Sequence, residues 1–127
     1  IYPVIEGSKE FKSYEENAEG YILTRNLMRW FYEHYLTNDK EREDWRVSPI
    51  QAKDLSNLPP TYIITVLSDP LRDEGREYAK ALKEAGNNVE HIEYDNAVHG
   101  FISWPLEIKL TKKAIEDISK SIRKIIK

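Results

Sequence analysis

Two side chains capable of acid–base chemistry follow closely on two predicted strands. Asp69 comes after the strand Thr61–Leu67, and His99 comes after the strand Val89–Tyr94. Neighbouring parallel strands end at the same edge of a sheet, where active sites commonly form, so we expect these two side chains to meet. A carboxylate beside an imidazole selects its tautomer and stabilises the imidazolium that forms when the ring takes up a proton. The pair is therefore a candidate for general acid–base catalysis.

Each residue taken singly also has a purely structural interpretation. Asp69 precedes Pro70 and is followed by Asp73 and Glu74, which is the usual composition of a helix N-terminus, so Asp69 would serve as a cap. A histidine beside a glycine in a loop is commonly a surface or packing residue. Under this interpretation the chain is a small α/β binding domain. The two interpretations differ in whether Asp69 bonds His99 or the amides of its own helix.

The other residues capable of chemistry offer weaker candidates. His34 lies on a predicted amphipathic helix and His91 within a polar strand, and neither has ligand spacing to another histidine, so no metal site is expected. Aromatic residues repeat at helical spacing on the same predicted helix, which favours a place in the core (Trp30, Phe31, Tyr32 and Tyr35).

The elements that must position the pair alternate between strand and helix. Residues 1–6 are a predicted apolar strand, residues 7–60 a helical excursion with connectors, and residues 61–127 a strand–helix–strand–helix unit. Within the excursion, Thr24 resembles an N-cap. Gly86 stands where a helix C-terminal glycine is expected. The last helix shows an apolar stripe (Ile108, Ala114, Ile115, Ile118, Ile122 and Ile125).

This order predicts an α/β fold with a parallel sheet of about three strands and flanking helices. The first strand would present an unpaired apolar edge, and an unpaired edge tends to associate with another strand. The chain opens on the apolar run Ile1–Ile5 without an initiating Met, so we expect it to be part of a longer protein. The partner at this edge would be the N-terminal half of the same protein or a second copy of this chain.

Composition narrows the functional classes. The 127 residues suit one domain, 40% of them are hydrophobic and 32% charged, and the net charge is −3 with acidic and basic residues interleaved. No basic patch that would attract nucleic acid is present, and no apolar run reaches the length of a membrane span. The absence of cysteine excludes disulfides and thiolate chemistry, and it favours a reducing, cytoplasmic location.

Several blocks of the sequence together resemble the hormone-sensitive-lipase family of α/β-hydrolase esterases. The most specific are the run Asp69-Pro70-Leu71-Arg72-Asp73-Glu74-Gly75 and the later His99-Gly100-Phe101. Further blocks agree in order along essentially the whole chain (Ile1-Tyr2-Pro3, Asn17-Ala18-Glu19-Gly20-Tyr21, Leu23-Thr24-Arg25, Ser48-Pro49, Asp54-Leu55-Ser56, Leu58-Pro59-Pro60, Tyr78-Ala79, Leu82 and Ala85-Gly86-Asn87). The resemblance implies the C-terminal part of an α/β-hydrolase, which is an incomplete fold by itself.

The resemblance implies a serine carboxylesterase that hydrolyses small acyl esters without a cofactor. It assigns Asp69 as the acid of a Ser-Asp-His triad and His99 as the general base, in the chain order of that family. Leu71, Val98 and Phe101 flank these two residues and are expected to line the substrate pocket.

The sequence departs from the family at the nucleophile. It contains no Gly-x-Ser-x-Gly elbow and no oxyanion loop of the His-Gly-Gly type, and Ser48 and Ser68 lack the sharp strand-to-helix turn that exposes a catalytic serine. We therefore expect the isolated chain to be inactive and the activity to belong to the intact protein. A non-catalytic association module and a small binding domain with Asp69 as a cap stay open as alternatives.

Overall fold

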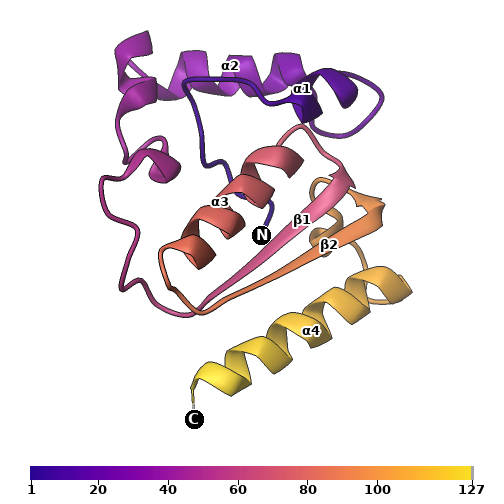
Figure 1. The fold of residues 1–127 in the computed structure, drawn as a ribbon. Coiled ribbons are helices and arrows are strands. Elements are labelled where there is room, and N and C mark those ends of the chain that lie inside the picture. The colour runs from indigo at the N-terminus through magenta and orange to yellow at the C-terminus, as the bar shows by residue number, and fades with distance from the viewer. Residues whose placement is uncertain (127) are drawn as a thin grey trace.

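The fold is a strand–helix–strand–helix unit joined to a helical excursion, as the computed structural model of residues 1–126 describes it (Figure 1). The strands are β1 (Thr61–Ser68) and β2 (Val89–Val98), and the helices are α1 (Lys12–Glu16), α2 (Arg25–Tyr35), α3 (Arg72–Glu84) and α4 (Lys109–Ile125). Three short 3₁₀ turns connect them, η1 (Asp39–Glu43), η2 (Pro49–Gln51) and η3 (Phe101–Ser103). The α/β class predicted from the sequence is confirmed.

The two strands form a parallel pair between two helical layers. Thr61 pairs with Val89 and the register runs on to Val66 and Tyr94, with an irregularity before the last pair, Ser68 and Val98. Helix α3 covers one face of the pair and α4 the other (Figure 1). Because successive strand residues point to opposite faces, each face has its own apolar cluster. The α3 side buries Ile63, Ala79 and Leu82, and the α4 side buries Ile64, Val66, Tyr94, Ala97, Phe101 and Ala114.

The predicted third strand, residues 1–6, is not a strand among the residues described, where the sheet has two strands. The segment does run beside β1, because the Tyr2 amide donates to the Ile64 carbonyl at 2.6 Å. The ladder does not continue, since Pro3 has no N–H to donate and Tyr2 adopts a positive φ of 31°. Ile1 and Val4 remain exposed, and association through this edge stays a prediction.

Helix α2 begins where the sequence predicted, but it buries a different face. Thr24 caps it by accepting from the Leu27 amide at 3.1 Å. Met28 and Tyr32, four residues apart, are buried, whereas three of the four aromatic residues predicted to be core are exposed (Trp30 at 50%, Phe31 at 45% and Tyr35 at 75%). Apolar side chains surround much of this helix, so their spacing did not define one face.

Helix α4 likewise packs through smaller residues than its isoleucine stripe predicted. Thr111, Ala114 and Ser121 are buried and Ile118 is half-buried against the core, whereas Ile108, Ile115, Ile122 and Ile125 are exposed. The Thr111 hydroxyl donates to the Phe101 carbonyl at 3.1 Å. Small side chains let the helix backbone approach η3 closely, and this contact sets which face is buried.

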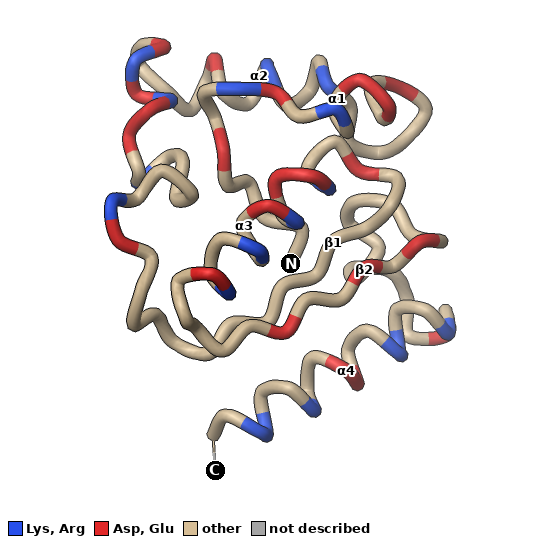
Figure 2. The backbone as a smooth tube through the Cα atoms, viewed as in Figure 1, with Lys and Arg blue, Asp and Glu red and all other residues tan. Residues whose placement is uncertain are grey.

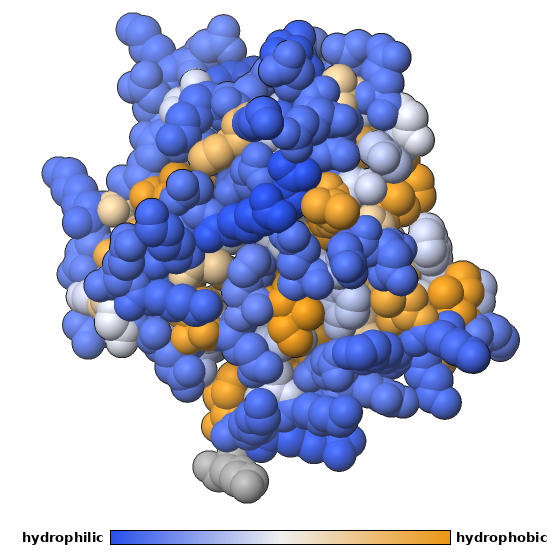
Figure 3. All heavy atoms as spheres, turned by 45° about the vertical axis from the view of Figure 1, so that its right-hand side comes forward, coloured by the Kyte–Doolittle hydropathy of each residue, from blue (hydrophilic) through white to orange (hydrophobic). Residues whose placement is uncertain are grey.

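Charged residues of both signs are interleaved over α1, α2 and α3, and α4 carries mostly basic ones (Figure 2). On the face shown in Figure 3, hydrophobic residues form separate patches within a largely hydrophilic surface. Among residues 1–126, no helix combines the length and the apolarity that a bilayer crossing requires.

A close approach of α3 to β1 depends on Gly75. A Cβ at this position would lie 2.6 Å from Cγ2 of Thr65, a side chain that cannot easily move because its hydroxyl bonds His91 and Glu93. We expect Gly75→Ala to lower the free energy of unfolding by about 1–3 kcal/mol through overpacking, although alanine normally stabilises a helix relative to glycine. Urea unfolding measures this change.

The matched control is Lys80→Ala on the same helix, where the side chain is exposed and the expected change is within about 0.5 kcal/mol. A Gly75→Ala variant as stable as the wild type would contradict the packing described for this contact.

Candidate active site

The Asp69 carboxylate lies at the carboxyl end of β1 and uses its two oxygens for two different contacts. Its Oδ1 accepts from the Leu71 amide at 2.9 Å, and its Oδ2 lies 2.8 Å from Nδ1 of His99. The side chain is fully buried. The pairing interpretation therefore describes a real contact, whereas Asp69 is not the cap of α3: the helix begins at Arg72 without a side-chain cap hydrogen bond, and the Leu71 amide lies in the turn before it.

The direction of the Asp69–His99 hydrogen bond follows from the chemistry of a carboxylate. An ionised carboxylate only accepts hydrogen bonds, so Nδ1 of His99 carries the proton and donates it to Oδ2. The other ring nitrogen, Nε2, is then left as an acceptor. This is the tautomer in which an imidazole can take a proton from a hydroxyl group.

His99 reaches this position because the chain turns immediately after β2. Gly100 has a φ of 84°, in the left-handed region that favours glycine, and the chain then enters η3. The His99 side chain is 25% exposed, in contrast to the fully buried Asp69. The buried partner thus orients the ring, and the ring keeps access to solvent.

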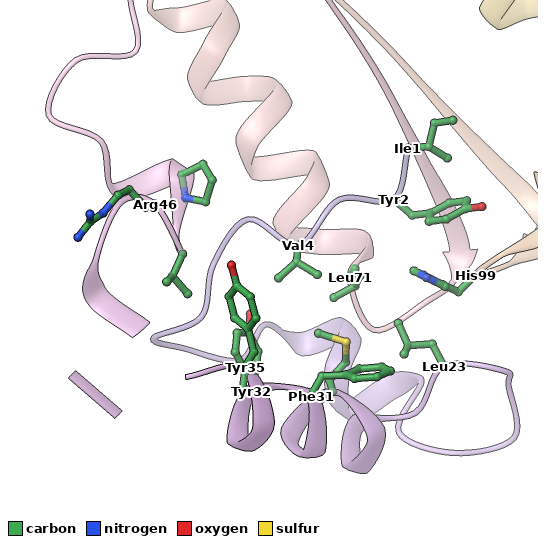
Figure 4. A pocket seen from close by; sticks show the side chains of 13 residues that line it. Ile1, Tyr2, Val4, Leu23, Phe31, Tyr32, Tyr35, Arg46, Leu71 and His99 are labelled. Carbon is green, nitrogen blue, oxygen red and sulfur yellow. The ribbon is translucent and has the colours of Figure 1, made fainter. Parts of the chain in front are cut away.

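His99 stands at one end of an open cavity of about 650 Å³ (Figure 4). The cavity lies between the N-terminal segment, α2 and the start of α3, and its walls are mainly apolar (Ile1, Tyr2, Val4, Leu23, Met28, Phe31, Tyr32, Tyr35, Arg46, Val47, Pro49, Leu71 and His99). These wall residues include no serine, threonine or cysteine. The described chain therefore places an imidazole at an apolar cavity, and the cavity wall holds no hydroxyl or thiol of serine, threonine or cysteine.

The family model for the alpha/beta hydrolase fold matches residues 1–103. The chain belongs to this family. Among its relatives, the carboxylic ester hydrolase LipN of Mycobacterium tuberculosis is 38% identical over 104 residues, which are 81% of this chain and 28% of LipN. The ethyl acetate hydrolase of Pseudomonas putida is 34% identical over 102 residues, 80% of this chain and 32% of that protein.

Solved structures agree with the assignment. The thermophilic carboxylesterase EstE1, from a metagenomic library, superposes with a TM-score of 0.94 at 35% identity over 100% of this chain and 44% of its own. The α/β-hydrolase LAE6 from the Lake Arreo metagenome gives 0.84 at 43% identity, over 90% and 36% of the two chains. The resemblance to hormone-sensitive-lipase-type carboxylesterases is confirmed, and the chain spans about a third of the length of the curated relatives above.

The structure separates the three residues predicted to line a substrate pocket. Leu71 is buried in the cavity wall. Phe101 is fully buried in the α4-side core, where its ring packs against Tyr94 at 5.3 Å, and it is not part of the wall. Val98, the last residue of β2, is half-buried and also lies outside the wall. Phe101 belongs to the core because a large aromatic ring is most stable out of water.

Some cavity residues come from α2, where the sequence predicted core residues, and others from the N-terminal segment. Phe31 and Tyr35 project from α2 into the cavity, across from Tyr2 and His99 (Figure 4). Both side chains are exposed and not buried in the core, and they form part of the cavity wall. Tyr2 carries no motif signal apart from its place in the Ile1-Tyr2-Pro3 block, and its ring contacts the His99 imidazole in a tilted arrangement.

A second hydrogen-bonded cluster lies away from the cavity, between β1, β2 and α3. His91 Nε2 lies 2.9 Å from the Thr65 hydroxyl, which donates to Glu93, and Glu93 pairs with Arg76. The Thr65 hydroxyl cannot meet a substrate because the residue is 1% exposed. This cluster therefore ties α3 to the sheet. In residues 1–126, no group of three or more histidine or acidic side chains is placed to hold a metal ion.

Glu74, read from the sequence as an ordinary acid of a first helical turn, is fully buried behind Asp69. Its Oε2 accepts from the Glu6 amide at 3.2 Å, and its Oε1 has no hydrogen-bond partner within the described residues. Burial raises the pKa of this carboxyl to about 8, opposed by the backbone hydrogen bonds of Glu6 and Ile5 and reinforced by the nearby carboxylates. Glu74 is thus protonated at neutral pH.

This raised pKa predicts a stability that falls as the pH rises. The unfolded carboxyl ionises near 4.5 and the folded one near 8, so the folded state binds more protons between these values. Glu74 therefore stabilises the fold fully below pH 4.5 and loses that contribution as the pH approaches 8, with a slope of up to about 1.4 kcal/mol per pH unit. Glu74→Gln removes the slope, because the amide does not titrate.

Urea unfolding of wild type and Glu74→Gln between pH 5 and pH 9.5 measures the difference. We expect the unfolding free energy of Glu74→Gln to increase relative to that of the wild type as the pH rises. The difference should level off above pH 8. A constant difference across this range would contradict a neutral, buried Glu74.

Proposed function

We propose that this chain supplies the acid and the general base of a Ser-Asp-His triad that hydrolyses carboxylic esters. The observation that carries the proposal is the 2.8 Å contact between Asp69 Oδ2 and His99 Nδ1, with His99 at the wall of an apolar cavity. The serine and the oxyanion donors come from residues outside these 127, because the chain has no Gly-x-Ser-x-Gly elbow.

In the proposed reaction, His99 Nε2 takes the proton of the serine hydroxyl while the serine oxygen attacks the ester carbonyl carbon. Asp69 stabilises the imidazolium that results. The tetrahedral intermediate collapses, His99 gives the proton to the leaving alcohol, and an acyl-enzyme remains. Water then attacks the acyl group with His99 again as base, which releases the carboxylic acid and restores the serine.

The apolar cavity supports small acyl esters as substrates. Its walls are aliphatic and aromatic, which suits the hydrocarbon part of an ester, and His99 provides the polar group at one end. The relative from Pseudomonas putida is an ethyl acetate hydrolase, and this name supports the same substrate class.

A fusion protein with EstE1 tests the proposal. This chain replaces the 44% of EstE1 that it superposes on, and the remaining EstE1 residues supply what the chain lacks. We expect the 127-residue chain alone to leave p-nitrophenyl butyrate intact and the fusion to hydrolyse it. A fusion that folds by circular dichroism but does not turn over the ester, beside active EstE1, would contradict the proposal.

A further inference from the structure

The residue closest to the face of the proposed base is an aromatic ring from a distant part of the sequence. The Tyr2 ring centroid lies 4.4 Å from that of His99, with 51° between the ring planes, and 6.4 Å from that of Phe101. Figure 4 shows the Tyr2 and His99 side chains together at one end of the cavity. Tyr2 therefore covers the imidazole on a side that Asp69 does not touch.

The backbone holds Tyr2 in this place at a conformational cost. Its amide donates to the Ile64 carbonyl at 2.6 Å, which ties it to β1. Its φ of 31° is one of two positive values at non-glycine residues among those described. Such a conformation is unfavourable for a residue with a side chain, and it persists only where the surroundings impose it.

The far end of the Tyr2 side chain reaches the loop that carries His99. Burial raises the pKa of its phenol, whereas hydrogen bonds with the backbone of Ile102 and of Gly100 lower it. The ring contact with the imidazole restrains this short loop.

The Cβ–Cγ bond and the hydrogen bond at Nδ1 hold one side of the His99 imidazole, so the ring can still rock about these two anchors. Rocking would move Nε2, on the opposite side of the ring, relative to any group placed at the cavity end. Packing against the Tyr2 ring limits this motion. We infer that Tyr2 is a positioning residue, which holds the plane of the His99 imidazole so that Nε2 faces the cavity.

The inference rests on the proposed function only for its catalytic consequence, because the contact itself can be measured in the 127-residue chain without a serine. Nuclear magnetic resonance of this chain should show a nuclear Overhauser contact between the Tyr2 and His99 ring protons. Its absence would overturn the inference without any variant.

Two substitutions separate the ring from the hydroxyl. Tyr2→Phe keeps the ring face, so the His99 ring protons should keep the upfield ring-current shift of the wild type. Tyr2→Leu should lose that shift, and exchange of the His99 Nδ1–H with water should become at least about tenfold faster. In the EstE1 fusion, we expect Tyr2→Leu to lower kcat by about 10- to 100-fold with little change in KM, because misplacement of a base by about 1 Å costs up to about 10² in rate.

Tyr62 provides the matched control. It is half-buried and packs against the same core cluster, but it lies near the start of β1, away from the cavity. Tyr62→Leu should lower stability while leaving the His99 shifts and the kcat of the fusion unchanged. Equal effects of the Tyr2 and Tyr62 substitutions on kcat would overturn the inference, because a merely structural role would then account for both.

The outcomes distinguish this inference from the proposed function. If His99→Ala leaves the fusion active, the proposed function fails while the ring contact stands on the resonance data. If His99→Ala abolishes activity but Tyr2→Leu changes neither the Nδ1–H exchange nor kcat, the positioning role fails and the triad stands.

Discussion

His99→Ala should lower the kcat of the EstE1 fusion for p-nitrophenyl butyrate by about 10⁴- to 10⁶-fold. The serine hydroxyl loses the only base the described residues place at the cavity, and triad members act as a unit, so removal of one forfeits nearly the whole effect. Folding should be little affected, because the His99 side chain is partly exposed and its one side-chain hydrogen bond is to Asp69.

The control for this prediction is His34→Ala. His34 lies on α2, stacks on Trp30 and is exposed, and it is not among the cavity wall residues. Its substitution should leave kcat within a factor of about two, since surface changes away from a site are usually small. A His99→Ala fusion that keeps more than a tenth of the wild-type activity would remove His99 from the role of base.

Asp69→Asn should lower kcat by about 10⁴-fold while the fold is kept. Asparagine retains an oxygen that can accept from the Leu71 amide, so the turn before helix α3 keeps its hydrogen bond. The side-chain NH₂ group would face His99 Nδ1 and donate to it, which places the ring proton on Nε2. A ring protonated on Nε2 cannot accept the serine proton, and this wrong tautomer costs about 10⁴ in a serine protease.

Comparison with Asp69→Ala and Asp95→Asn makes the test specific. Asp69→Ala removes both contacts, so it should lower stability as well as activity. The unfolding free energy should fall by about 1 kcal/mol or more, because the buried Leu71 amide loses its hydrogen-bond partner. Asp95 is exposed on β2, and the same change to asparagine there should alter neither quantity. An Asp69→Asn fusion with normal kcat would show that the carboxylate only stabilises the turn before α3.

The raised pKa of Glu74 adds a pH effect that is separate from the triad. Glu74 lies on the first turn of α3, five residues after Asp69, and its ionisation would introduce a second buried negative charge near Asp69. Activity profiles of the fusion above pH 8 should therefore be read beside stability curves, so that loss of fold is not taken for titration of His99.

Local features of the chain were enough to predict several elements and the acid–base pair. The run Thr61–Leu67 is nearly continuous in β-formers, Thr24 is a capping residue before a helix, and Gly86 has the φ of 85° expected of a helix C-terminus. These signals lie within one element and act on neighbouring residues. The pairing of Asp69 with His99 followed because both come directly after strands that the connection rules place side by side.

Other features depended on which surfaces meet in three dimensions. Phe31 and Tyr35 line a cavity, Glu74 is buried without a partner for one oxygen, and Tyr2 covers His99, although nothing in their local sequence distinguishes them. The face that a helix buries depends on the partner it packs against, and helix α2 has apolar residues on more than one side.

The sequence by itself therefore determined the family, the order of the elements and the two residues of the pair, because these depend on residue type and on spacing along the chain. Only the tertiary structure decided that residues 1–6 do not complete a third strand, that Asp69 bonds both the Leu71 amide and His99, and which side chains surround the imidazole. These contacts join residues far apart in the sequence, from Tyr2 to His99, and their free energies depend on burial and geometry that no local pattern contains.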